Sequence, residues 1–153
     1  MRIYGHNNEK ANFNIQRTTL VHYGERTLKL IPFPGHSACT MLVEIDDIFL
    51  HIADELMFSP EGEPILPLAT GGFEMHINSL KKFENCEKTI IIPAHGPIFS
   101  GANLEAEAAK RLPYLQACLD ADGNISYEEA TKNCGTAFVY ENWHDVNTKG
   151  ETP

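Results

Sequence analysis

The chain has 153 residues, of which 42% are hydrophobic and 9% aromatic, enough to build the core of a single domain over residues 1–153. Its 12 Lys and Arg and 21 Asp and Glu residues give a formal net charge of −9. This balance argues against nucleic-acid binding, which depends on a local excess of positive charge. No stretch is apolar enough for a membrane span, and residues 1–10 are too polar for a secretory signal. We therefore expect a cytoplasmic protein without nucleic-acid or membrane partners.

Strands are predicted in the first two thirds of the chain, where β-branched and aromatic residues gather in short runs. Gly24-Glu25 and Asp46-Asp47 interrupt these runs, as the turns of two hairpins do. A later run is wholly apolar, which is typical of a strand buried on both faces. The predicted strands span residues 18–23, 27–33, 41–45, 48–52 and 89–92.

Helices are predicted mainly in the last third. Apolar residues recur at helical spacing over residues 74–83 and 104–119, and Pro113 is expected to kink or divide the second helix. Ser126 and Glu129 have the spacing of a capping box, so another helix should begin there. Strands followed by interleaved helices predict an α/β or α+β fold.

The C-terminal part, residues 111–153, is expected to form a helical extension and tail. Its Asp120–Glu129 segment has calcium-type side chains at loop positions 1, 3 and 5, but Glu129 falls at position 10 instead of 12. We therefore predict a turn between helices there. The polar end, residues 147–153, is expected to fray.

The four cysteines contain no C-x-x-C pair that would indicate a zinc knuckle or a redox motif. In a cytoplasmic protein they are expected to be reduced thiols that serve in packing. They are Cys39, Cys86, Cys118 and Cys134.

Three segments place a polar side chain directly after a predicted strand: Pro34-Gly35-His36-Ser37, Ala53-Asp54 and Ala94-His95-Gly96-Pro97. Strand ends hold side chains rigidly, as metal and catalytic sites require. Two imidazoles and a carboxylate also form a donor set suited to first-row metals. Taken singly, each has an ordinary explanation: His36 and His95 as loop residues, and Asp54 as the cap of a helix beginning at Glu55.

In their order and spacing these segments resemble the metallo-β-lactamase-fold hydrolases. The resemblance is carried by Phe33-Pro-Gly-His-Ser, Ile48-Phe-Leu-His-Ile-Ala-Asp and Ile91-Ile-Pro-Ala-His-Gly-Pro, and it extends over residues 1–110. In that family the three motifs supply one metal-binding His, an Asp that bridges two metals, and a later His. The resemblance thus implies that His36, Asp54 and His95 are metal ligands and that Asp54 is the catalytic carboxylate.

The family's H-x-H-x-D-H segment, which supplies most of the ligands, has no counterpart in residues 1–10. The chain therefore resembles the C-terminal half of an α/β sandwich, with one mostly antiparallel or mixed sheet and flanking helices. Three ligands shared between two metals are too few for a catalytic pair. Alone, the chain is expected to bind zinc, iron or manganese weakly or not at all and to be inactive. A smaller departure is Ala53, where the family usually has Gly.

Other histidines are candidates for further metal ligands. His6 lies in a polar segment and is expected to be exposed, while His51 alternates with apolar neighbours and is expected to be half-buried. Ser79-Leu80 resembles the family's Y-x-x-S-L helix, with His76 in place of Tyr. This position implies that His76 lines the substrate pocket.

Two classes of function compete. If a missing half is supplied, the resemblance implies a zinc hydrolase in which two cations activate a bridging hydroxide. Its small-molecule substrate would be an ester, thioester, lactone, lactam or phosphoester. The alternative is a non-catalytic half-fold that binds or assembles after losing its metal chemistry. Either way one apolar sheet face lacks its cover, so we expect a homo-oligomer or a complementing N-terminal half as partner.

Overall fold

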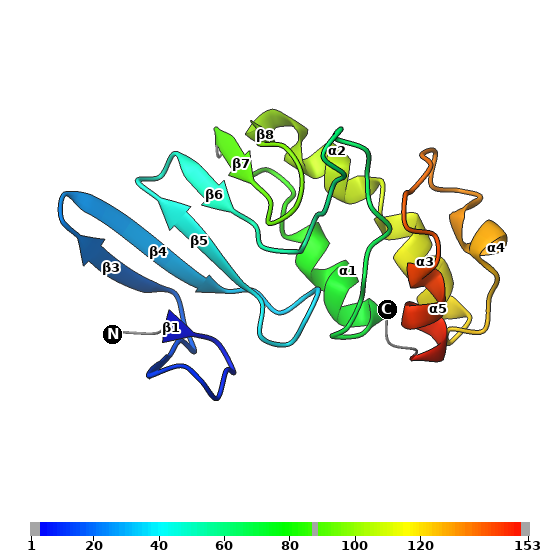
Figure 1. Ribbon diagram of the computed structural model, residues 1–153, viewed down its shortest axis with the longest axis horizontal. Coiled ribbons are helices and arrows are strands. Elements are labelled where there is room, and N and C mark those ends of the chain that lie inside the picture. Colours follow the sequence, from blue (N-terminus) through cyan, green and yellow to red (C-terminus); the bar gives the residue numbers. More distant parts are fainter. Residues whose placement is uncertain (1–3, 87–88, 151–153) are drawn as a thin grey trace.

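A six-stranded mixed sheet forms one side of the fold, and the helices lie beside it (Figure 1). The computed structural model describes residues 4–86 and 89–150. Strand order follows chain order, and every neighbouring pair is antiparallel except β6 and β7, which are parallel. The strands are β3 (Thr19–Tyr23), β4 (Arg26–Pro32), β5 (Met41–Ile45), β6 (Phe49–His51), β7 (Ile90–Ile92) and β8 (Phe99–Ser100).

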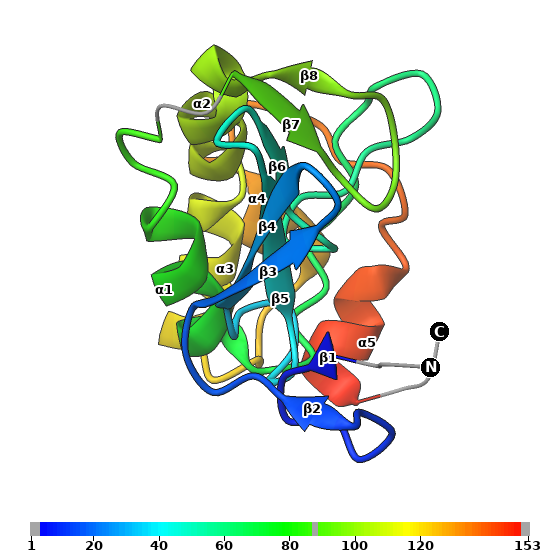
Figure 2. The same cartoon turned by 90° about the vertical axis from the view of Figure 1, so that its left-hand side faces the viewer.

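Helices cover one face of this sheet (Figure 2). The parallel β6–β7 pair requires a long crossover, and the crossover contains α1. A separate two-stranded sheet pairs β1 (Tyr4–Gly5) with β2 (Phe13–Asn14). Within the described ranges, no helix is long and apolar enough to cross a membrane. The helices are α1 (Phe73–Lys81), the 3-10 turn η1 (Gly101–Asn103), α2 (Leu104–Ala109), α3 (Leu112–Asp120), α4 (Tyr127–Thr131) and α5 (Trp143–Lys149).

Local sequence signals account for most of the element boundaries. Asp46 and Asp47 both have positive φ, 51° and 58°, as the two-residue hairpin turn they were predicted to form requires. Pro113 lies in the first turn of α3 and divides the predicted 104–119 helix into two. Ser126 Oγ accepts from the amide of Glu129, so α4 begins with the predicted cap.

Strand register sorts the side chains onto two faces. One row across β4 to β7 contains Lys29, Glu44, Leu50 and Ile91. Leu50 is 5% exposed and Ile91 0%, and they belong to the core cluster shared with α1 and α3. This row therefore faces the helices, and the hydrophobic core lies between it and them.

The opposite face of the sheet is apolar but half-open. The row beside the core-facing one consists of Val21, Leu28, Ile45, Phe49 and Ile90. All five are only partly buried, and a contiguous row of accessible apolar side chains is typical of an interaction surface. We call this row the open face.

Two expectations about the ends of the chain were wrong. His6 is only 8% exposed, because its Nδ1 lies 2.7 Å from the carbonyl oxygen of Ile15. Residues 147–149 continue α5 instead of fraying. Asn147 anchors this turn: it accepts from the amide of Ala69 at 2.9 Å and donates to the carbonyl of Pro67 at 2.8 Å. Residues 151–153 lie outside the described part.

We propose that a second copy covers the open face in the purified chain. Light scattering at micromolar concentration should then give the mass of a dimer or a larger assembly. Ile45→Arg should shift the population toward monomer, because burying an unpaired charge on this face is costly. Leu20→Arg, at a site that is 58% exposed on the other face, is the matched control. A monodisperse wild-type monomer would contradict the proposal.

Candidate functional site

Asp54 and His95 follow the two parallel neighbours, β6 and β7. In the β6–β7 register His51 pairs with Ile92. Asp54 lies three positions after His51, and His95 lies three positions after Ile92. The ladder continues past the strands, because the amide of Ile52 donates to the carbonyl of Ile92 at 2.9 Å. As a result His95 Nε2 lies 3.4 Å from Asp54 Oδ1. The parallel pairing has brought together two of the three predicted ligands.

The residue before Asp54 holds a strained backbone. Ala53 has a φ of 51°, the left-handed region that disfavours any residue with a Cβ. Its carbonyl accepts from the amide of Ala94 at 2.9 Å, and its amide donates to His51 Nδ1 at 3.3 Å. These bonds hold the turn, and its conformation explains why glycine is usual at this position in the family that the sequence resembles.

The carboxylate of Glu55 connects the His36 loop to this turn. Its Oε1 accepts from the amide of His36 at 2.9 Å, and its Oε2 accepts from Ser79 Oγ of α1 at 2.5 Å. Glu55 is 1% exposed, and burial raises the pKa of its carboxyl group to about 7. A single buried side chain therefore joins three separate segments of the site.

Gly35 is required by this arrangement. A Cβ at this position would lie 2.1 Å from Ser79 Oγ and 2.3 Å from Glu55 Oε2. Any side chain would therefore displace the carboxylate that holds His36. The Pro-Gly-His motif thus has a steric explanation in the structure.

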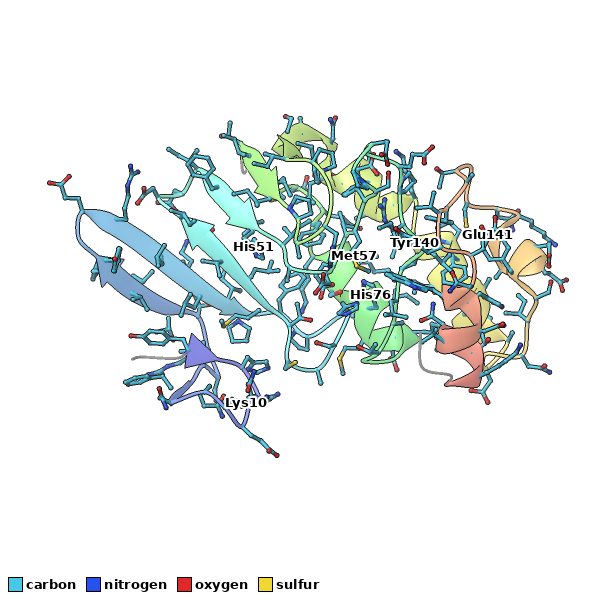
Figure 3. The ribbon with its side chains drawn as sticks, in the orientation of Figure 1. Lys10, His51, Met57, His76, Tyr140 and Glu141 are labelled. Atoms are coloured by element: carbon cyan, nitrogen blue, oxygen red, sulfur yellow. The ribbon has the colours of Figure 1, made fainter. Side chains whose placement is uncertain are left out.

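His76 is a buried residue of α1 (Figure 3) whose ring contacts that of His36. Its ring centroid lies 6.2 Å from that of His36 in an edge-on arrangement, and its Nε2 lies 3.2 Å from the carbonyl oxygen of Glu55. The side chain is 0% exposed, and burial lowers the pKa of its imidazole to about 4. The expectation that His76 lines an open substrate pocket does not match this position, since the core encloses the ring.

Three buried polar atoms at the site have no hydrogen-bond partner in the described part of the chain: His36 Nδ1, Asp54 Oδ1 and His76 Nδ1. Buried polar groups in native proteins are almost always paired, and an unpaired one costs roughly 1–3 kcal/mol. Imidazole nitrogen and carboxylate oxygen are both ligand types for first-row metals. A further group that bonded to any of these atoms would offset that cost.

The predicted ligands do not form a complete metal site by themselves. Within residues 4–86 and 89–150, no group of three or more His, Cys, Asp or Glu side chains is arranged to hold a metal ion. Asp54 lies beside His95. The ring of His36, in contrast, makes an edge-on contact with the ring of His76. A metal centre that includes His36, Asp54 and His95 would therefore need further ligands.

The structure shows whether Asp54 caps a helix. It also shows a role for Glu55, which the sequence did not indicate. No helix begins at Glu55, because residues 53–56 form a turn, so Asp54 is not a helix cap. The sequence pattern predicts Glu55 only as the first residue of that helix. Its position directly after the predicted ligand at a strand end was the available signal.

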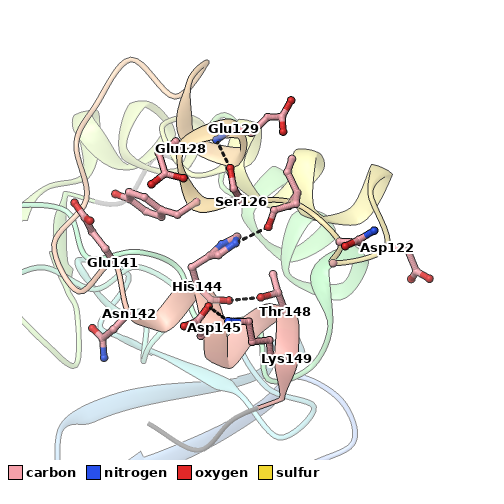
Figure 4. Close-up of a pocket in the computed structure, with 14 residues that line it drawn as sticks. Asp122, Ser126, Glu128, Glu129, Glu141, Asn142, His144, Asp145, Thr148 and Lys149 are labelled. Atoms are coloured by element: carbon pink, nitrogen blue, oxygen red, sulfur yellow. Dashed lines mark hydrogen bonds and ion pairs between the residues drawn. The ribbon is translucent and has the colours of Figure 1, made fainter.

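A wide hollow of about 840 Å³ lies in the C-terminal extension, between α4 and α5 (Figure 4). Its rim is acidic, but the polar groups at its centre have partners. His144 Nε2 lies 2.9 Å from the carbonyl oxygen of Ile125, and Thr148 Oγ1 donates to the carbonyl of His144 at 2.8 Å. These contacts pack α5 onto the extension, so the hollow has a structural explanation.

Comparison with known proteins identifies the fold. No protein-family model and no curated protein sequence matches the chain. Among solved structures, an archaeal metallo-β-lactamase superfamily protein from Sulfolobus tokodaii is similar, with a TM-score of 0.54 and 20% identity over 90% of this chain. ETHE1 from Myxococcus xanthus has a TM-score of 0.59 and 15% identity over 96% of this chain. A sec-alkylsulfatase from Pseudomonas sp. has a TM-score of 0.55 and 11% identity over 88% of this chain.

The chain has a metallo-β-lactamase fold over part of that fold's length. It spans 50% of the archaeal protein, 63% of ETHE1 and 24% of the sulfatase. The α/β class and the mixed sheet with flanking helices predicted from the sequence are thereby confirmed. The site described above lies in the matched region, at the carboxyl ends of β6 and β7.

Replacing Ala53 by glycine should stabilise the fold. Glycine adopts a φ of 51° without the steric cost that alanine bears there. We expect a gain of roughly 0.5–1 kcal/mol in the free energy of unfolding by urea denaturation. Ala121→Gly, at a C-cap with a φ of −92°, should not be stabilising. A loss of stability in Ala53→Gly would show that the turn is not strained.

Glu55→Gln should change how stability depends on pH. The pKa of Glu55 in the folded protein, about 7, lies above the ordinary value of 4.5. The contribution of this group to the free energy of unfolding of the wild type is therefore lost as pH rises from about 4.5 through 7. Glutamine does not titrate. Denaturation of metal-free protein between about pH 5 and pH 8 should therefore show the wild type losing roughly 2–3 kcal/mol relative to the variant. Parallel profiles for the two proteins would refute the buried, neutral carboxyl group.

Proposed function

We propose that this chain contributes His36, Asp54 and His95 to the metal centre of a metal-dependent hydrolase with a metallo-β-lactamase fold. The observation that carries the proposal is that His36 Nδ1 and Asp54 Oδ1 are buried without a hydrogen-bond partner among the described residues, with His95 Nε2 3.4 Å from Asp54 Oδ1. The fold supports it, because these residues follow the strands of the matched region. Zinc is the expected metal, with iron or manganese as alternatives.

Each residue has a distinct task in this proposal. Asp54, which lies beside His95, would contribute its carboxylate to both cations and serve as the catalytic carboxylate. His36 and His95 would each help to hold one cation. Glu55 holds the backbone at His36 and is thus a positioning residue. When bound, the metals would supply a water of lowered pKa and polarise the bond to be cleaved.

The substrate class left open by this chemistry is broad. Esters, thioesters, lactones, lactams and phosphoesters all contain an electrophilic centre that a metal-activated water attacks. Fold alone does not choose among them. The further ligands would come from a second copy or from a complementing N-terminal half, because the described residues group fewer than three ligands together.

The second candidate function is a non-catalytic half-fold that binds or assembles. One observation favours it: within the described ranges the chain does not form a metal-binding group of three side chains by itself. The half-open apolar face would then be its working surface. The two candidates differ in whether His36 and His95 bind metal.

Metal content tests the proposal. Protein purified without a His-tag is dialysed against about 50 µM zinc, a concentration that populates weak sites, and zinc per chain is measured by inductively coupled plasma mass spectrometry. We expect bound zinc that is lost in His36→Ala and in His95→Ala but kept in His22→Ala, an exposed residue of β3.

Zinc content that is equal in all four proteins would overturn the proposal. Zinc that is absent from the folded wild type would overturn the assembly of this metal centre from copies of the chain alone and would favour the non-catalytic half-fold. Circular dichroism of each variant checks that a lost ion does not reflect a lost fold.

A further inference from the structure

A compact aromatic pocket of about 320 Å³ opens beside His95. Its size is at the lower end of known ligand sites, which is enough for one ring with a short substituent. None of its walls carries an Asp, Glu, Lys or Arg side chain, although the chain as a whole has a net charge of −9. It is lined by Phe58, Ser59, Pro60, Ile65, His95, Gly96, Tyr140 and Trp143.

The wall nearest the candidate metal site is rigid. The amide of Phe58 donates to the carbonyl of His95 at 3.2 Å. A Cβ on Gly96 would lie 2.5 Å from the Cβ of Phe58, and Gly96 has a φ of 97°. On another side the guanidinium of Arg111 lies 4.8 Å from the Phe58 ring centroid. The pocket and the His95 turn are therefore parts of one packed unit.

Another wall of the pocket consists of a stacked aromatic pair at the start of α5. The rings of Tyr140 and Trp143 are 5.3 Å apart with an interplanar angle of 21°. A bridge between Ile65 and Val139 holds this segment against the pocket. Tyr140 has a φ of 61° and is 50% exposed, a combination of strain and exposure that is more typical of binding sites than of packing.

We propose that the aromatic pocket binds an uncharged, planar aromatic group of the ligand. Aromatic walls favour a ring that can lie against them in an offset or edge-on arrangement. Charge-free walls disfavour an ionic group, because nothing in the pocket compensates its desolvation. The proposal that this ligand is the substrate rests on the proposed function. Among the described residues that line the pocket, His95 is the one that also belongs to the candidate metal centre. The scissile bond would then lie within one short substituent of the ring.

Trp143 is the only tryptophan in the chain, so its fluorescence reports on the pocket directly. Metal-free protein in a chelating buffer is titrated with phenylacetamide, with the size-matched cyclohexylacetamide and with tetramethylammonium. We expect a saturable change with phenylacetamide, at least threefold weaker binding of the cyclohexyl compound, and no change with the cation. Equal binding of the first two, or tighter binding of the cation, would overturn the proposal.

Variants assign the binding to these rings. Tyr140→Ala should weaken phenylacetamide binding about three- to tenfold, while Tyr140→Phe, which keeps the ring, should bind like the wild type. Tyr23→Ala, at a 78% exposed site on the distant β3–β4 hairpin, is the matched control and should have no effect. The absence of a saturable signal up to about 10 mM phenylacetamide in folded wild type would refute the pocket.

This titration and the zinc measurement fail independently. Ring binding without zinc binding would overturn the assembly of the metal centre from copies of the chain alone and leave the pocket as a ligand site. Zinc binding without ring binding would overturn the pocket alone. In zinc-loaded protein, phenylacetohydroxamate should bind more tightly than acetohydroxamate, and Tyr140→Ala should abolish the difference. Equal binding of the two hydroxamates would separate the pocket from the metal centre.

Discussion

The parallel pairing of β6 with β7 determines where the polar groups of this molecule meet. Parallel strands end at the same edge of a sheet, so the turns that carry Asp54 and His95 lie side by side. The pairing also requires a long crossover, and that crossover contains α1, which places Ser79 and His76 beneath the same edge. With an antiparallel pair the two turns would lie at opposite edges of the sheet and no common site would exist.

A buried carboxyl group then connects the parts that the sheet brings near one another. Glu55 accepts hydrogen bonds from the backbone amide of His36 and from the Ser79 hydroxyl. Gly35 has no Cβ and therefore leaves room for the carboxyl group of Glu55. The same compact packing leaves nitrogen and oxygen atoms on His36 and Asp54 without partners. Because buried polar atoms in native proteins are almost always hydrogen-bonded, the lack of hydrogen-bond partners for these atoms among the described residues is consistent with the proposed metal centre.

Local patterns in the sequence predicted the hairpins, the division of the long helix at Pro113 and the cap at Ser126, because short-range chemistry decides these features. The three strand-end motifs predicted His36, Asp54 and His95 as ligands, and strand pairing places Asp54 and His95 3.4 Å apart. The burial of His6 and His76 depends on contacts with other segments, that of Ile15 for His6 and that of Glu55 for His76, which no periodic pattern records. The aromatic pocket likewise joins residues 58–65 to residues 140–143 through a single bridge, and only the folded structure shows that pairing.

The central claim is that His36 and His95 bind metal through their rings. The most direct test is nitrogen-15 NMR of the imidazole nitrogens of all seven histidines during a zinc titration, with assignments from single His→Gln variants. The account predicts that ring nitrogens of His36 and His95 shift together while those of His22 and His144 stay in place. Shifts confined to other histidines, or none at any ring in the folded protein, would contradict it.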